Sequence, residues 1–257
     1  MRYEPTAPPI VLSPHLDDAV LSAFTVLRAD PRPLVANVCD GVPPDGTASF
    51  SVRLCGATDA AAQMRRRRAE DTEALGRLGC ESASLGFLEA DGRPLEAEPG
   101  VDDLHRALAG ACSAAGAVHA PIGMGSHPDH LLVRDLGFAI HEATRMPLWL
   151  YADLPYAITW GWPAWVSGED PDPNLDPGAA WKRAIDRLPV GEEALEPAVV
   201  HLDEVAQAQK RQTLAVYESQ LSMLAGGPHA RLDGWALSRE VRWRVGDSQG
   251  ASAHGHK

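Results

Sequence analysis

Apolar runs alternate with helical patterns along the first 150 residues, and this alternation constrains the fold more than any other feature. Strand-like runs occupy residues 10–12, 34–38, 82–87, 117–120 and 148–151. Helical patterns lie between them, at about 18–29, 57–78, 101–115 and 130–143. Strand, helix, strand in this order predicts a largely parallel sheet covered by helices on both faces. We therefore expect an α/β protein, a Rossmann-like three-layer sandwich with a mostly parallel central sheet and a small C-terminal extension.

Two segments interrupt the alternation. Residues 40–58 form a long, turn-rich loop after the second strand, where loops tend to carry binding groups. Residues 160–189 contain four tryptophans among many prolines and glycines. These rings can stack on a sugar, although anchoring an irregular insertion is their more common use. Beyond them we expect a helix over 204–224 and a strand or hairpin over 235–245.

The length of 257 residues suits one substantial hydrophobic core. We predict a single domain over residues 1–246. The tail, residues 247–257, is rich in Ser, Gly and His and is predicted to be disordered.

An acidic-histidine cluster follows the first strand-like run, with the sequence Ser13-Pro14-His15-Leu16-Asp17-Asp18. It lies where a strand ends and a helix begins, which is where open α/β sheets hold their sites. His15 and Asp18 are three residues apart, so both side chains can turn toward one point at the helix start, while Asp17 faces elsewhere. Two of these side chains can therefore bind a metal ion and the third can remain free.

A second cluster lies at mid-chain, with the sequence Ser126-His127-Pro128-Asp129-His130. It precedes an apolar run that fits a helix, and its two histidines have the same three-residue spacing. Two His and one carboxylate with an open water position form a recurrent catalytic Zn²⁺ site. The two clusters together can supply these ligands and spare acid-base groups.

Each cluster also has a purely structural interpretation. An Asp pair before a helix is usually an N-cap and a first-turn carboxylate near the positive end of the helix dipole. An isolated His-x-x-His is more often a surface pair than a metal site. Both clusters follow strand-like runs, however, and this shared context favours the functional interpretation.

The two clusters resemble the motifs of the PIG-L, or LmbE-like, family of zinc-dependent N-deacetylases, whose members act on N-acetylglucosaminyl conjugates. Residues 15–19 match the first motif, His-Pro-Asp-Asp-Glu, and residues 127–130 match the second, His-Pro-Asp-His. The resemblance implies that the metal ligands are His15, Asp18 and His130.

The same resemblance implies roles for the remaining polar residues. Asp17 would be the general base, and His127 would stabilise the oxyanion or protonate the leaving amine. Asp129 would orient His127. Two positions depart from the family pattern, since Leu16 replaces a proline and Ala19 replaces a glutamate. Neither departure removes a ligand or the base, so we expect activity to survive with an altered choice of substrate.

Four consecutive arginines, residues 65–68, resemble the family's Arg-rich helix, in which one arginine reaches the sugar. Arg67 is our first choice for this substrate-binding role and Arg68 our second. The alternative is a solvated, salt-bridged helix face. Residues 151–156 and 217–221 also resemble family segments but indicate no roles.

The resemblance implies a Zn²⁺ cofactor, with Fe²⁺ or Co²⁺ as other possibilities. The expected reaction removes an N-acyl group, in the first place N-acetyl, from an amino-sugar conjugate of secondary-metabolite or low-molecular-weight thiol biosynthesis. One alternative is a metal-dependent amidase of a thiol S-conjugate. Another is a non-catalytic carbohydrate-binding protein of the same fold, which the loss of the glutamate at Ala19 favours. A nucleotide-binding enzyme would need a Gly-x-Gly-x-x-Gly loop after the first strand, and this sequence has none.

Composition limits the partners. The formal net charge of -12 argues against a nucleic-acid surface, so the expected partner is a small amino-sugar substrate, with a homo-oligomer left open. The four cysteines form no Cys-x-x-Cys pair, so the sequence indicates neither a zinc knuckle nor a redox motif. We find neither a signal peptide nor an apolar run of membrane-spanning length, and therefore expect a cytoplasmic protein without membrane insertion.

Overall fold

The computed structural model describes residues 7–47, 52–53, 55–94, 99–159, 161–170, 172–220 and 236–246. Within these ranges the strands form one seven-stranded sheet in the order β3-β2-β1-β4-β5-β7-β6. Their bounds are β1 (Ile10–Ser13), β2 (Leu34–Asn37), β3 (Glu81–Ser84), β4 (Val118–Pro121), β5 (Leu148–Tyr151), β6 (Leu195–His201) and β7 (Arg239–Val245). Strands β1 to β5 are parallel and overlap the five expected runs, although β3 ends three residues before the run expected over 82–87; the α/β class is confirmed.

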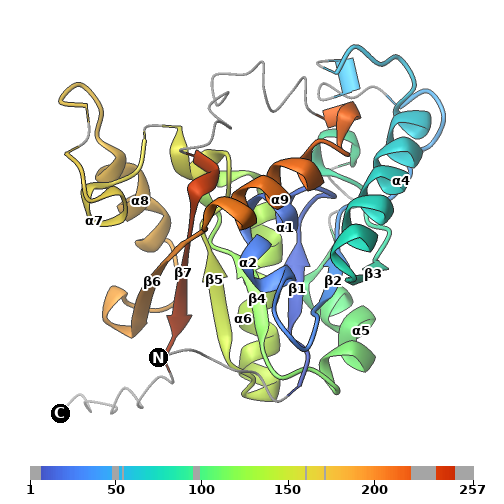
Figure 1. Cartoon of the computed structure of the whole chain (residues 1–257). Helices are drawn as coiled ribbons and strands as arrows, with labels where there is room; N and C mark the ends of the chain where they lie inside the picture. Colours follow the sequence, from blue (N-terminus) through green and yellow to red (C-terminus); the bar gives the residue numbers. More distant parts are fainter. Residues whose placement is uncertain are drawn as a thin grey trace.

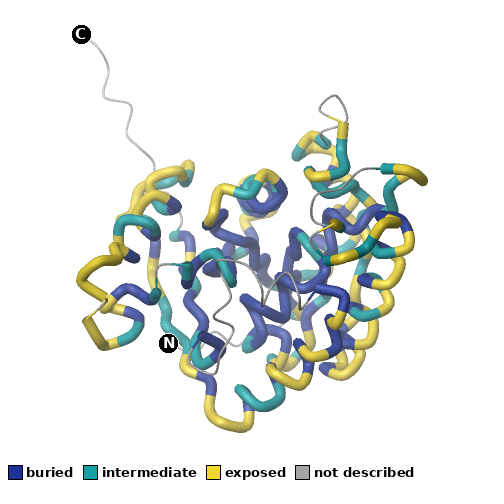
Figure 2. Tube along the Cα trace, turned by 90° about the horizontal axis from the view of Figure 1, so that it is seen from above, coloured by how far each residue is buried: buried dark blue, intermediate teal, exposed yellow. Residues whose placement is uncertain are grey.

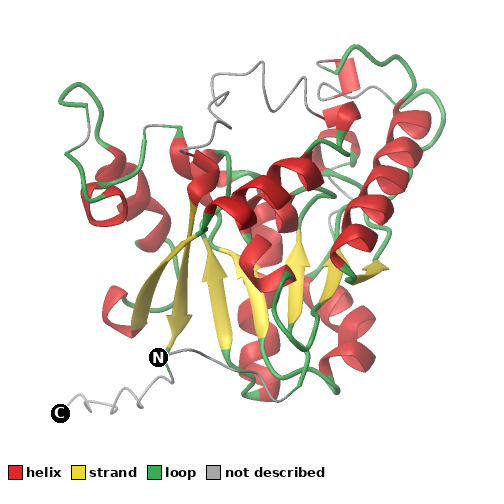
Figure 3. Ribbon diagram, viewed as in Figure 1, coloured by secondary structure: helices red, strands yellow, loops and turns green. Residues whose placement is uncertain are grey.

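Helices cover both faces of the sheet, as Figures 1 and 3 show. Helices α1, α2, α4 and α9 lie in front of it in this view, and α5 and α6 lie behind. Helices α7 and α8 extend the molecule beyond the β6–β7 side. Their bounds are α1 (Asp18–Ser22), α2 (Phe24–Leu27), α4 (Ala60–Leu78), α5 (Val101–Cys112), α6 (Pro128–Thr144), α7 (Ala164–Ser167), α8 (Pro177–Ile185) and α9 (Glu204–Leu214).

Helix α4 shows how local chemistry sets the helix ends. The Asp59 carboxylate accepts a hydrogen bond from the N–H of Ala62 at 2.9 Å, which caps the first turn. Gly79 follows the last turn with φ +71°, a left-handed conformation that glycine adopts without strain. Between these ends α4 buries Met64, Arg67, Asp71 and Leu75 on one face. This face therefore carries two ionisable groups into the interior.

Two expected helices differ from the structure. The helix expected over 18–29 is broken at Ala23, where φ is −130°, and continues as α2 because the carboxylate of Glu240 accepts the N–H groups of Phe24 and Thr25. The helix expected over 204–224 ends as α9 at Leu214, and residues 221–224 of the expected range lie outside the described residues.

Strands β6 and β7 form the antiparallel edge of the sheet. The sequence predicted β7 within residues 235–245 but not β6. Strand β6 contains Pro197, and most of its residues are only partly covered, so its pattern does not read as a strand. Because β6 is the edge strand, it can hold a proline.

The core lies along the sheet, and Figure 2 shows the buried centre surrounded by exposed segments. One hydrophobic cluster extends from Ile10 to Val245. Trp162 and Trp181 are buried in it, so these rings anchor the 160–189 segment, whereas Trp165 is half exposed. The domain limits 1–246 stay a prediction, and the tail 247–257 and Trp160 lie outside the described residues. Across the described ranges, no helix combines the length and apolar character needed to cross a membrane.

A buried polar group connects α4 with β2 and the C-terminal region. The carboxylate of Asp71 accepts hydrogen bonds from the Tyr217 hydroxyl at 2.8 Å and from the Asn37 amide at 2.7 Å. Burial raises the pKa of Asp71 to about 7, although both of these hydrogen bonds act against the rise. The folded protein therefore holds a proton on Asp71 at pH values where the unfolded chain has lost it.

This difference predicts a pH dependence of stability. Between about pH 4 and 7 the native state binds more protons at Asp71 than the unfolded state, so the free energy of unfolding falls as pH rises. Asp71→Asn removes this titrating group. Over that pH range, the free energy of unfolding of the variant should therefore decrease by about 2–4 kcal/mol less than that of the wild type. Urea unfolding of both proteins at pH 5 and pH 7.5 measures it. Parallel profiles for the two proteins would contradict the assignment.

Strand order reverses between β1 and β4, which are parallel neighbours. In a doubly wound sheet, ligands bind beside the carboxyl ends of the strands at such a reversal. The first cluster begins at the last residue of β1, and the second lies in the loop between β4 and α6. The fold therefore brings them together at this edge.

Candidate metal centre and active site

The first loop is shaped by Ser13, the last residue of β1. Its hydroxyl donates to the carbonyl of His15 at 2.6 Å and accepts the N–H of Ala19 at 3.0 Å. The N–H of His15 in turn donates to Asp18 at 2.9 Å. Leu16 and Ala19, the two departures from the family motif, are both buried. The loop thus presents its polar side chains while Ala19 packs in the hydrophobic core.

The second loop depends on glycine. Gly125 has φ +76°, and a Cβ built there would lie 2.5 Å from the ring of Tyr156. Ser126 also has a positive φ of 60°. Helix α6 then begins at Pro128, whose fixed φ suits the first helical position. The tight turn sets His127 and His130 against the first loop.

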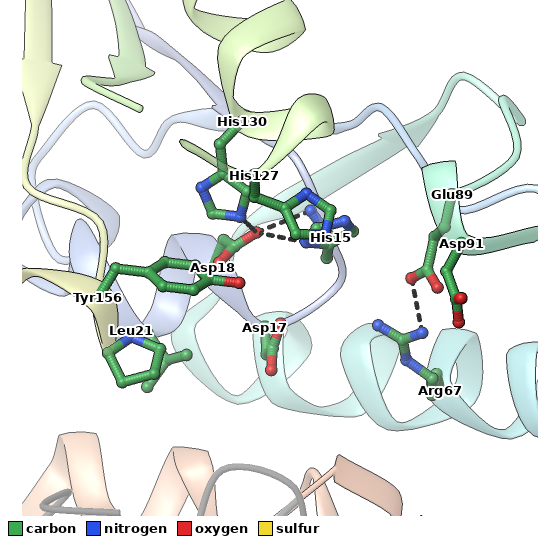
Figure 4. Close-up of a pocket in the computed structure, with 11 residues that line it drawn as sticks. His15, Asp17, Asp18, Leu21, Arg67, Glu89, Asp91, His127, His130 and Tyr156 are labelled. Carbon is green, nitrogen blue, oxygen red and sulfur yellow. Dashed lines mark hydrogen bonds and ion pairs between the residues drawn. The ribbon is translucent and has the colours of Figure 1, made fainter. Parts of the chain in front are cut away.

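Asp18 lies between two imidazoles. Its Oδ2 is 3.2 Å from Nδ1 of His15 and 3.3 Å from Nε2 of His130. Neighbouring ligands of a tetrahedral metal with bonds of about 2.0–2.1 Å lie about 3.3–3.4 Å apart. The three side chains that the sequence indicated as ligands therefore meet with the spacing of a metal site, as Figure 4 shows.

Each of these imidazoles also contacts a further carboxylate, through the ring nitrogen that does not face Asp18. Nε2 of His15 is 3.0 Å from Asp129, and Nδ1 of His130 is 2.6 Å from Asp153. Carboxylates in this position fix the orientation of a metal-binding histidine and raise its basicity. Asp129 was expected to orient His127, but its Oδ2 is 3.9 Å from Nδ1 of that ring. The carboxylate faces His15 instead, because Arg93 and the N–H of Ala90 hold it there.

Asp153 was not selected from the sequence, although it follows β5 at the same edge of the sheet. Its other oxygen accepts the N–H groups of Gly123 and Met124, both at 2.9 Å, so Asp153 also holds the second loop. Asp153→Asn should weaken Zn²⁺ binding by about 10- to 100-fold. An amide has only one oxygen, so it cannot accept hydrogen bonds from both the His130 imidazole and the backbone N–H groups. A competition titration with a chelator measures this. The exposed Asp135→Asn is the control, and equal affinities in both variants would contradict this role.

The carboxylates around the three proposed ligands favour a positive charge at the centre of the site. Burial raises the pKa of Asp18, but the charge of His130 and hydrogen bonds to both imidazoles outweigh it and hold the pKa far below its usual range. Burial lowers the pKa of His130, but the charge of Asp18 and the bond to Asp153 raise it to about 9. A divalent cation can supply this positive charge in place of protons. Charge, donor type and spacing therefore all suit Zn²⁺.

His127 extends the possible ligand set. The three imidazoles offer nitrogen atoms that all lie within 4.8 Å of one another. Nδ1 of His127 accepts the N–H of Asp129 at 3.3 Å, so a neutral ring carries its proton on Nε2. Burial, followed by the charges of His15 and His130, lowers the pKa of His127 to about 4. At neutral pH this side chain can donate a hydrogen bond from Nε2.

Asp17 lies beside these residues and points into the same pocket (Figure 4). Burial and the adjacent charge of Asp18 raise its pKa to about 6, against the opposing charges of Arg67 and His15. A carboxyl with a pKa near neutrality both accepts and returns a proton readily. Asp17 therefore has the properties of a general base.

The pocket has a volume of about 140 Å³. Arg67 lines it, held by Glu89 at 2.6 Å and Gln220 at 2.9 Å. Arg68 turns away to Asp40 and Ser84. Glu89, Asp91 and Tyr156 also line the pocket. The sequence did not select Glu89 or Asp91, which lie in an irregular segment without a motif, and it gave no role to Tyr156, although residues 151–156 resemble a family segment.

Comparisons with known proteins bear on this arrangement. No protein-family model matches the chain. A comparison with curated proteins found no match either. Solved structures do match: a triple mutant of a deacetylase involved in the teicoplanin biosynthetic pathway is 25% identical, covers 95% of this chain and 100% of that one, and has a TM-score of 0.68.

Two further structures are similar. A deacetylase of the A40926 pseudoaglycone is 26% identical, with 93% of this chain and 97% of that chain covered and a TM-score of 0.68. The zinc-inhibited form of a teicoplanin deacetylase is 22% identical, with 95% and 100% covered and a TM-score of 0.68. The fold seen here is thus shared with these proteins over almost the whole chain.

Proposed function

Because its motifs and its fold both identify the chain as a member of the PIG-L, or LmbE-like, family of zinc-dependent deacetylases, we propose that it removes an N-acyl group from an amino-sugar conjugate. The bond broken is an amide C–N bond, and the products are a carboxylate and a free amine. We further propose that N-acetyl is the preferred acyl group.

One observation carries this proposal. Asp18 lies at ligand spacing from His15 and His130, and Asp17 stands beside it in the same pocket without belonging to that set. A metal site with an adjacent free carboxylate is what hydrolysis of an amide requires. A binding protein has no need of a buried base, so this pairing supports catalysis over the non-catalytic alternative.

Zn²⁺ bound by His15, Asp18 and His130 would lower the pKa of a water molecule toward about 7 and polarise the amide carbonyl. Asp17 then takes the proton of the attacking water and returns it as the reaction proceeds. His127 donates from Nε2 toward the oxygen on which negative charge develops, or toward the leaving nitrogen. Asp129 and Asp153 hold the two imidazoles in place.

Arg67 is proposed to bind the sugar. Its guanidinium lines the pocket beside Asp17, and Glu89 and Gln220 fix its orientation. The similar structures are described as deacetylases of teicoplanin biosynthesis and of the A40926 pseudoaglycone. This similarity supports a glycosylated secondary metabolite as the natural substrate.

The test is release of free amine from N-acetylglucosamine conjugates by the purified protein. We expect turnover with one equivalent of Zn²⁺, loss of activity after chelation and recovery when Zn²⁺ is restored. Arg67→Gln should raise KM more than it lowers kcat, whereas Arg68→Gln should change neither. Absence of amine release from every conjugate by the zinc-loaded protein would contradict the proposal.

A further inference from the structure

A second pocket adjoins the metal centre. Its volume is about 310 Å³, more than twice the 140 Å³ of the first. Tyr156 lines both pockets, and its ring also contacts His130, with centroids 5.4 Å apart. A conjugate whose amide lies at the metal centre can therefore extend past Tyr156 into the larger space.

Helix α8 and the loop before α6 form the walls of this second pocket. The indole of Trp181 donates to the carbonyl of Ala157 at 2.9 Å, which fastens α8 to the segment that carries Tyr156. Met124, Trp181 and Ala184 give the pocket an apolar floor. The space is thus built from elements already tied to the metal centre.

The two pockets differ in charge. The first is lined by the carboxyl groups of Asp17, Asp18, Glu89 and Asp91. The second is lined by the exposed arginines Arg183 and Arg187, and no carboxyl group is among its described lining residues. Arg187 donates to the hydroxyl of Ser126, at the rim and next to His127 in the chain. In a chain of net charge -12, this pocket is locally cationic.

We propose that this pocket, the arginine subsite, binds an anionic group of the substrate, a carboxylate or a phosphate carried on an apolar or aromatic portion of the conjugate. The inference rests on the proposed function, since it assigns the part of the substrate distant from the amide. Guanidinium groups bind carboxylate and phosphate through paired hydrogen bonds. The apolar floor suits the portion that carries the anion. After hydrolysis, the ammonium group formed at the other end faces the acidic first pocket.

The test compares three aryl glycosides of N-acetylglucosamine that differ only in the para substituent of the ring: carboxylate, phosphate or neutral carboxamide. The wild type should hydrolyse at least one anionic conjugate with a kcat/KM about tenfold above that of the carboxamide, mainly through KM. The anion preferred distinguishes a carboxylate subsite from a phosphate subsite. Equal values for all three conjugates would overturn the proposal.

Variants locate the effect. Arg183→Gln and Arg187→Gln should each remove most of the preference for the anion, lowering kcat/KM for the anionic conjugates by a larger factor than for the carboxamide conjugate. Lys182→Gln is the matched control, because Lys182 lies on the same helix, pairs with Asp186 at 2.6 Å and does not line the pocket. Arginine variants that slow all three conjugates equally would instead indicate a structural role and contradict the subsite.

A binding measurement separates this proposal from the proposed function. The corresponding glucosaminides, which lack the acetyl group, are titrated calorimetrically into the zinc-loaded protein. If no conjugate is hydrolysed, the deacetylase proposal fails, yet tighter binding of an anionic glucosaminide that is lost in both arginine variants still supports the subsite. Equal affinity for anionic and neutral glucosaminides contradicts it.

Discussion

Asp17→Asn should reduce kcat for amine release by about 10²- to 10⁴-fold while the protein keeps its metal. The amide has nearly the same shape as the carboxyl but cannot accept the proton of the attacking water. Asp17 is buried and lies beside the three proposed ligands without joining them. Its replacement therefore removes the base and leaves the metal site intact.

Two controls make this result specific. Zinc content measured beside activity should be the same in Asp17→Asn and the wild type. Asp91→Asn changes another carboxyl group of the same pocket and should alter kcat little. An Asp17→Asn protein with normal kcat would remove Asp17 from the mechanism, and one without zinc would make it a ligand.

Lys210→Met should lower the free energy of unfolding by about 3–5 kcal/mol. Lys210 and Glu240 are almost fully buried, and Nζ of Lys210 lies 2.8 Å from Oε1 of Glu240. The same carboxylate accepts the N–H groups that begin α2, so loss of the lysine leaves a buried charge at the junction of β7, α9 and α2. Urea unfolding measures the loss.

Matched variants separate burial from charge. The double variant Lys210→Met/Glu240→Gln should recover part of the stability, because neither charge is then left alone. Lys182→Met breaks the exposed pair with Asp186 and should leave the unfolding midpoint unchanged. If Lys210→Met were as stable as the wild type, the buried pair would not hold these elements together.

The parallel part of the sheet could be predicted because its signals are local. Strands β1, β2, β4 and β5 are short, largely buried apolar runs, whereas β3 is mostly polar and exposed. The first cluster begins at the last residue of β1, and the second lies in the loop between β4 and α6. The strand order then places both clusters at one edge. His15, Asp18 and His130 could therefore be selected from the sequence together with the family resemblance.

Other features depend on residues distant in the chain. The break at Ala23 is stabilised by Glu240, more than two hundred residues later. Strand β6 is held at the sheet edge by β7 and has no pattern of its own. Neither feature leaves a signal in its own segment, so both escaped prediction.

The residues that contact the imidazoles could be predicted only in part. Asp129 was selected, but the hydrogen bond of its carboxylate to His15 follows from the positions of Arg93 and Ala90 in another segment. Arg67 and Arg68 are adjacent on α4, and the sequence does not distinguish their directions. In the structure, Arg67 pairs with Glu89 in the pocket, whereas Arg68 pairs with Asp40 outside it. Sequence supplied the functional groups, and tertiary contacts decided their pairing.

Zinc content of Asp18→Asn and His127→Ala beside the wild type tests the central claim most directly. We predict about one zinc per chain in the wild type and in His127→Ala, and none in Asp18→Asn, because Asp18 lies between both ligand imidazoles while His127 stands outside the set. Retention of zinc in Asp18→Asn together with its loss in His127→Ala would contradict the account and identify a site of three histidines.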